Sequence, residues 1–192
     1  MKFLDFKFYK ENYIAILALV FSIIFVKVFN LNHIVENSLL ENIQLLALGA
    51  GFFACLKTKK YKVFFTFLAL VIFLMMAREI SYGRVFFARI PGGTSDELYG
   101  WSHFKYGYLA HIFVGIYIAL GILYALIKKI WVDIIEIIKT IAFPVWTFLM
   151  SFGCVVIQLL SEKTLHSTVI EETAEFMLYC LILALILIYR KK

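Results

Sequence analysis

Several side chains able to take or give a proton recur at helical spacing near the ends of long apolar runs. Glu79 and Tyr82 lie three residues apart, as do Glu172 and Glu175, so each pair can share one face of a helix. An unpaired carboxylate beside an apolar run is costly, so such positions are often functional. This pattern makes Glu79 and Glu172 candidate general bases.

Two histidines are candidate acid-base partners for these glutamates. His103 and His111 fall at four-residue steps with Gly107, so the three form one stripe if their helix begins before Gly107. Imidazole exchanges protons near neutral pH. For His111, a hydrogen-bonded structural histidine within the apolar run is an equally good interpretation.

Cationic and polar residues beside the carboxylates are candidates for holding a substrate. Arg78 and Arg84 flank Glu79, and arginine binds phosphate or carboxylate groups through paired hydrogen bonds. The simpler alternative is that these charges anchor helix ends among lipid headgroups. The candidate binding residues are Arg78, Arg84, Glu41, Gln44, Tyr82, Glu175 and His166.

The spacings favour neither a metal nor a cofactor. The chain has no HExxH or ExxH pattern, and Glu162 and His166 are one residue too far apart for the second. A bis-histidine haem needs two imidazoles at one depth, and only His111 lies well inside an apolar run. We therefore predict no cofactor and no metal.

The elements that position these residues are transmembrane helices. Of the 192 residues, 63% are hydrophobic and 17% charged, which excludes a cytosolic enzyme and leaves little chain for a soluble domain. At about 20 residues per crossing, the apolar runs supply about six helices. We predict one all-α transmembrane domain over 1–192, with spans near 13–29, 41–56, 63–80, 107–127, 141–160 and 172–189, an outer loop at 81–106 and an interfacial segment at 130–139.

The distribution of charge predicts the orientation. Thirteen of the 19 Lys and Arg residues fall on the side of the termini, so the positive-inside rule puts both termini in the cytoplasm. Nine of the 13 acidic residues fall on the other side. The net charge of +6 is thus explained as an orientation signal, and no nucleic-acid partner is expected. The predicted location is the bacterial inner or plasma membrane.

The run from Arg78 to Phe87 resembles a Glu-(Ile/Val)-Ser-(Trp/Tyr)-Gly segment of uncharacterised bacterial multi-pass membrane proteins. Those proteins commonly have a second glutamate where this chain has Arg78, and a histidine segment that His103 matches best. The resemblance implies no activity. CAAX-protease-like intramembrane peptidases are similar in combining glutamates with later histidines, but their EExxxR spacing is not met by Arg78, Glu79 and Arg84. Alkaline-ceramidase-like hydrolases use an aspartate that no span of this chain has.

The sequence leaves three functions open. The first is a membrane-embedded hydrolase or transferase that acts on a lipid or lipid-linked substrate, with Glu79 or Glu172 as base, His103 or His111 as partner and Arg84 holding an anionic group. The second is a small transporter or a proton or cation channel, although the inner halves of the spans are mostly apolar. The third is an assembly protein with a protein partner. Membrane lipids are expected partners in each case, and the oligomeric state is open.

Overall fold

The computed structural model describes residues 4–29, 39–82, 101–105, 107–165 and 167–191. These residues form a helical bundle, which confirms the all-α part of the predicted fold class. Long apolar runs form helices here because each helix satisfies its own backbone hydrogen bonds.

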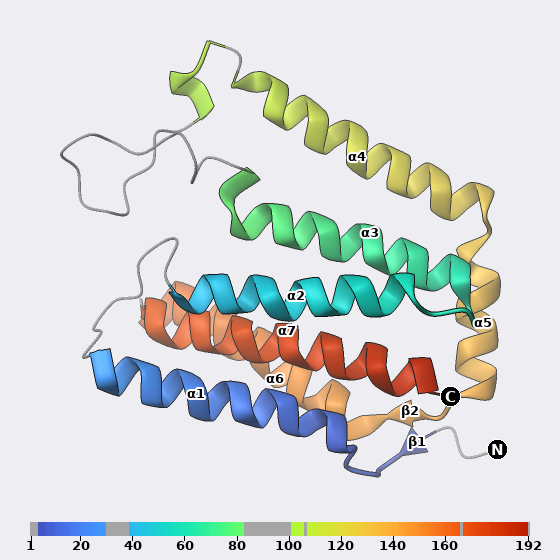
Figure 1. Cartoon of the computed structure of the whole chain (residues 1–192), viewed down its shortest axis with the longest axis horizontal. Coiled ribbons are helices and arrows are strands. Elements are labelled where there is room, and N and C mark those ends of the chain that lie inside the picture. Colours follow the sequence, from blue (N-terminus) through green and yellow to red (C-terminus); the bar gives the residue numbers. More distant parts are fainter. Residues whose placement is uncertain (1–3, 30–38, 83–100, 106, 166, 192) are drawn as a thin grey trace.

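The described residues form seven α-helices, of which six run side by side and one lies across an end of the bundle (Figure 1). Both chain termini lie at the end that carries this crosswise helix, which we call the termini end; the opposite end is the far end. The lengthwise helices are α1 (Tyr13–Phe29), α2 (Leu39–Leu56), α3 (Lys62–Glu79), α4 (Tyr108–Ile127), α6 (Val145–Leu160) and α7 (Thr168–Lys191), and the crosswise helix is α5 (Ile130–Thr140).

Four helical stretches in the described part of the chain are long and apolar enough to cross a membrane. The helix α2 contains a shorter apolar stretch, Asn42–Leu56. The helix α3 has 18 residues, of which Lys62, Arg78 and Glu79 are charged and stand at its ends. The four long stretches are Lys10–Phe29, Tyr108–Ile127, Val145–Leu165 and Thr168–Lys191.

The helix α7 is the centre of the bundle. It packs against α1, α2 and α6, and it carries more buried side chains than any other described helix. Gly51 of α2 faces this helix, because a β-carbon there would be in ordinary contact, at 3.4 Å, with the side chain of Ile186. The three cysteines, Cys55, Cys154 and Cys180, are buried free thiols.

The helix α4 lies at the edge of the bundle, beside α3 (Figure 1). None of its residues is buried, and the hydroxyl of Tyr117 donates a hydrogen bond of 2.8 Å to the carbonyl of Leu70 in α3. A helix this apolar and this exposed suits contact with lipid or with another protein.

At the termini end, α5 holds the start of α3. The carboxylate of Asp133 accepts a 3.0 Å hydrogen bond from the amide of Phe64, one of the orphan donors of a helix start. The hydroxyls of Tyr61 and Thr140 are 2.9 Å apart. The segment 130–139, which the sequence predicts to lie at the membrane interface, therefore forms α5 and lies across the ends of the lengthwise helices. Nearby, the two-residue strands β1 (Leu4–Asp5) and β2 (Phe143–Pro144) pair in parallel.

Candidate functional site

The end of α3 and the first half of α7 bring four polar side chains into contact toward the far end. The guanidinium of Arg78 donates to the carboxylate of Glu79 at 3.0 Å and to the hydroxyl of Tyr179 at 2.8 Å, and it also contacts the carboxylate of Glu175. The side chains of Glu79 and Glu175 are 6% and 9% exposed, whereas that of Arg78 is 54% exposed. Two nearly buried carboxylates thus share one cation that reaches the surface.

Tyr179 bridges the two carboxyl groups. Its hydroxyl oxygen lies 2.7 Å from an oxygen of Glu79 and 2.6 Å from an oxygen of Glu175. One hydroxyl hydrogen can serve only one of these oxygens. The hydroxyl therefore donates to one carboxyl group at a time, and its oxygen accepts a hydrogen bond of 2.8 Å from Arg78. The arrangement is a short hydrogen-bonded chain in which a proton can pass between the two carboxyl groups.

A second contact joins α2 to the start of α7. The amide nitrogen of Gln44 donates to the side-chain carboxylate of Glu172 at 3.0 Å and to its backbone carbonyl at 3.1 Å. Gln44 is fully buried, and its amide oxygen has no hydrogen-bond partner among the described residues. We refer to Gln44, Arg78, Glu79, Glu172, Glu175 and Tyr179 together as the far-end cluster.

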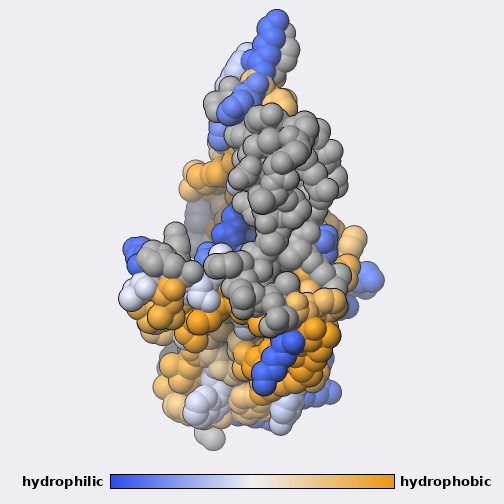
Figure 2. Space-filling model, turned by 90° about the vertical axis from the view of Figure 1, so that its left-hand side faces the viewer, coloured by the Kyte–Doolittle hydropathy of each residue, from blue (hydrophilic) through white to orange (hydrophobic). Residues whose placement is uncertain are grey.

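Acidic groups outnumber basic ones in the far-end cluster. Glu172 interacts electrostatically with Glu79 and Glu171, which repel its charge, and with Arg78, which attracts it. Viewed from the far end, hydrophilic residues interrupt the hydrophobic surface of the helices (Figure 2). The cluster therefore lies at an end of the bundle where polar groups reach the surface.

Helix periodicity explains how these side chains meet. Glu172, Glu175 and Tyr179 lie at steps of three and four residues, so α7 presents them on one face. The acidic residue in the first turn of α7, where the helix dipole favours a negative charge, is the neighbouring Glu171. The sequence analysis did not single out Tyr179. Its four-residue step from Glu175 was the signal that could have found it.

The predicted histidine stripe does not form. The helix α4 begins at Tyr108, and His103 belongs to a separate turn of 3-10 helix, Trp101–His103. Gly107 lies where the chain folds back, because a β-carbon there would be 1.7 Å from the carbonyl oxygen of Trp101. His103 and His111 are both exposed, and no hydrogen bond between the described residues joins either of them to Glu79.

Tyr82 does not share the face of Glu79 either. The helix α3 ends at Glu79, and Ser81 and Tyr82 both adopt left-handed backbone conformations, with φ of 46° and 53°. This turn directs Tyr82 to a pocket of about 510 Å³ between α3 and α4. Three other predicted site groups lie outside the described parts of the structure: Arg84, His166 and the side chain of Glu41.

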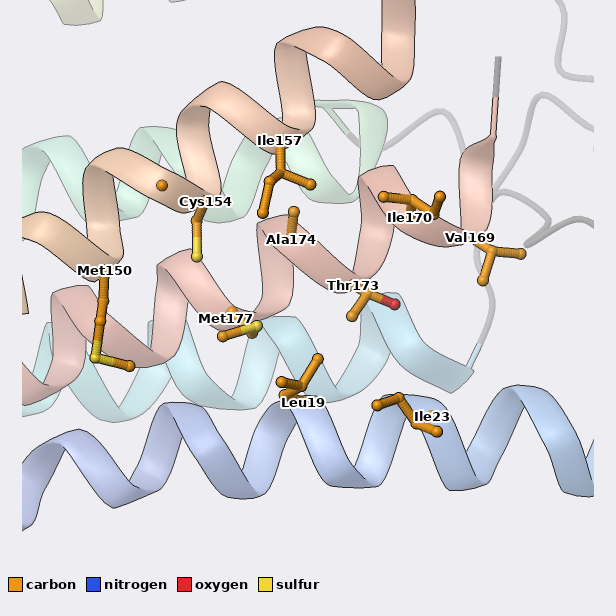
Figure 3. A pocket seen from close by; sticks show the side chains of 11 residues that line it. Leu19, Ile23, Met150, Cys154, Ile157, Val169, Ile170, Thr173, Ala174 and Met177 are labelled. Atoms are coloured by element: carbon orange, nitrogen blue, oxygen red, sulfur yellow. The ribbon is translucent and has the colours of Figure 1, made fainter. Parts of the chain in front are cut away.

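An apolar pocket lies on the side of α7 that faces α1 and α6. Its volume is about 440 Å³, and side chains of all three helices point into it, as Figure 3 shows for Leu19, Cys154 and Met177. Gly153 of α6 also lines it, and a β-carbon there would meet no atom within 4 Å. The pocket is open and almost wholly hydrophobic, as a site for a hydrocarbon chain must be.

A different polar cluster closes the termini end, and we call its four residues the termini-end cluster. The amine of Lys191 contacts the carboxylate of Glu11, whose side chain is 7% exposed. The hydroxyl of Thr147 donates a 2.9 Å hydrogen bond to the amide oxygen of Asn12, which is fully buried. These contacts fasten the N-terminal segment to α6 and α7.

Comparison with known proteins finds no matching family model, no similar curated protein and no similar solved structure. Among the described residues, no three His, Cys, Asp or Glu side chains are arranged to hold a metal ion. The chemistry of the site must therefore be argued from its own contacts.

Proposed function

We propose that this chain is a multi-pass membrane enzyme, a hydrolase or transferase that acts on a lipid or lipid-linked substrate at the far-end cluster. The observation that carries the proposal is the contact of one tyrosine hydroxyl with two carboxyl groups, Glu79 at 2.7 Å and Glu175 at 2.6 Å. Such a unit can accept a proton at one end and release one at the other.

The proposed roles follow from these contacts. Glu79 takes a proton from the attacking water or hydroxyl group, and Tyr179 with Glu175 returns a proton to the leaving group. We assign this second role to Tyr179 and Glu175 in place of His103 or His111, because the tyrosine contacts Glu79 directly. Arg78 balances the charge of Glu79, and Arg84 stays a candidate for holding an anionic group of the substrate.

The membrane arrangement is part of the proposal. We propose that all six lengthwise helices cross the bacterial inner or plasma membrane, with the termini end in the cytoplasm and the far end outside. Both termini lie at one end of the bundle (Figure 1), as an even number of crossings requires. The lysines at positions 57, 59, 60 and 62 lie between α2 and α3 or at the start of α3, at that same end, in keeping with the positive-inside rule.

The apolar pocket supports a lipid substrate. It lies at the same depth as Glu172 and Glu175 but on the opposite face of α7, since Thr173, Ala174 and Met177 line it. An acyl chain in this pocket would lie against α7 while its headgroup stays at the level of the far-end cluster. Burying such a chain stabilises the complex by about 0.8 kcal/mol per methylene group.

Transport is less well supported, because the interior of α7 is apolar between its two polar ends. From Cys180 to Ile188 every residue of the helix is apolar, and a proton or cation pathway needs polar groups along its length. An assembly role has one specific observation in its favour, the absence of buried residues in α4. A protein that co-purifies with the chain in equal amounts would support that role.

The test is lipid profiling by mass spectrometry of cells that express the native chain or its Glu79→Gln variant at equal membrane abundance. Removing the base should lower turnover about hundredfold or more, so a lipid species that changes with the native chain should not change with the variant. Glu136→Gln is the matched control, because Glu136 is exposed on α5 at the termini end. If native and Glu79→Gln cells have the same profile, the proposal is wrong.

A further inference from the structure

We infer that Gln44 and Glu172 form a binding site for a primary ammonium group, which the amine headgroup of a membrane lipid supplies. The assignment of a lipid as the source rests on the proposed function, whereas the ammonium site itself rests on the contacts and charges of these two side chains. The chemistry required is a cation that also carries several N–H donors.

The first argument is the unpartnered amide oxygen of Gln44. This side chain is fully buried, and its nitrogen is used twice by Glu172, whereas its oxygen accepts nothing from the described residues. Exchanging the two ends of the amide would place its oxygen against two oxygens of Glu172. The acceptor is therefore oriented by its neighbours, and leaving it unpaired costs about 1–3 kcal/mol.

The second argument is charge. Arg78, the cation nearest the cluster among the described residues, is engaged by Glu79 and Glu175. Those two carboxyl groups already outnumber the single guanidinium. Glu172 is a further carboxyl group, and its charge is repelled by Glu79 and Glu171 and attracted only by the same Arg78 among the interactions described. A cation bound at Glu172 balances this charge.

A primary ammonium group fits both arguments. It has one positive charge and three N–H donors, enough to serve the carboxylate of Glu172 and the amide oxygen of Gln44 together. A quaternary ammonium has no N–H and cannot satisfy the amide oxygen. A calcium ion needs six to eight oxygen ligands, more than two side chains provide. Glu172 is only half-buried at the far end, so a headgroup can reach it.

The experiment measures binding by native mass spectrometry of the full chain in detergent, with phosphatidylethanolamine and phosphatidylcholine of identical acyl chains as probes. The amine lipid should bind about tenfold more tightly, the effect of one charge-assisted hydrogen-bonded contact. Glu172→Gln and Gln44→Leu should each abolish this preference. Glu171→Gln should keep it, because Glu171 lies on the same turn of α7 but makes no described contact with Gln44. Thermal unfolding of each variant checks that it is folded.

A competition experiment with soluble amines tests the ammonium site separately from the assignment of a lipid as its source. Methylammonium should compete with the bound amine lipid, and tetramethylammonium should not. If methylammonium competes but the two lipids bind equally well, the assignment of a lipid as the source is wrong. If methylammonium does not compete and the two lipids bind equally well, the ammonium site itself is wrong. Binding requires no turnover. If the amine lipid shows no binding preference while lipid turnover still depends on Glu79, this inference is therefore wrong and the proposed function is unaffected.

Discussion

The two polar clusters at opposite ends of α7 resemble each other in their parts and differ in their balance. Tyr179 and Lys191 are about 18 Å apart along the helix at 1.5 Å per residue. Each cluster pairs a half-exposed cation with a nearly buried carboxylate: Arg78 is 54% and Glu79 6% exposed, and Lys191 is 58% and Glu11 7% exposed. The residue types and their exposed fractions therefore do not distinguish the roles of the two clusters.

The two clusters differ in their balance of hydrogen-bond donors and acceptors. At the termini end one carboxylate meets one amine, Thr147 serves the oxygen of Asn12, and the unpartnered buried atom is a donor, the Asn12 nitrogen. At the far end carboxyl groups outnumber the single guanidinium, and the unpartnered buried atom is an acceptor, the Gln44 oxygen. The charges of the termini-end cluster are thus paired one to one, whereas the far-end cluster has acceptors in excess, as we expect of the proposed site.

The largest expected effect is that of Tyr179→Phe at the far end. Loss of the hydroxyl breaks the chain between Glu79 and Glu175, so lipid turnover should fall about hundredfold, measured by the same lipid profiling. The aromatic ring is kept, and it fills the same buried space. Tyr124→Phe in the exposed helix α4 is the matched control. Normal turnover by Tyr179→Phe would mean that the far-end cluster is structural like its counterpart.

At the termini end, Thr147→Val should act on stability instead of turnover. It preserves the shape of a fully buried side chain and removes the donor to Asn12, which should lower the free energy of unfolding by about 1–3 kcal/mol. An unfolding titration with SDS in mixed micelles measures this, with Thr164→Val at the exposed turn after α6 as control. Reduced turnover per folded molecule would contradict the division between the two clusters.

The smallest effect is expected for Lys191→Met. The lysine is 58% exposed, so solvent screens its ion pair with Glu11 and the loss should be at most about 1 kcal/mol. The same titration at low and high salt should show the difference between native and variant shrinking as salt rises. A salt-independent loss would show that Lys191 contributes by packing. Lys128→Met, at the exposed turn after α4, controls for loss of a surface charge.

Helix positions could be predicted from the sequence because they depend on local properties. Runs of apolar residues of sufficient length mark α1, α4, α6 and α7, and turn residues and charges mark their ends. The face shared by Glu172 and Glu175 was predicted for the same reason. The stripe of His103 and His111 was wrong, since the chain folds back at Gly107 and the helix begins only at Tyr108.

The sequence by itself therefore determined an all-α, strongly apolar chain with glutamates, Arg78 and Gln44 placed near helix ends. Only the tertiary structure decided which of these side chains meet. Arg78 contacts Glu175 across 97 residues of sequence, and Gln44 contacts Glu172 across 128. Helical spacing specifies which residues share a face, because it depends only on backbone geometry. Which faces meet depends on how the helices pack, and here α7 lies between α2 and α1, so its polar face meets α2 and α3 while its apolar face meets α1 and α6.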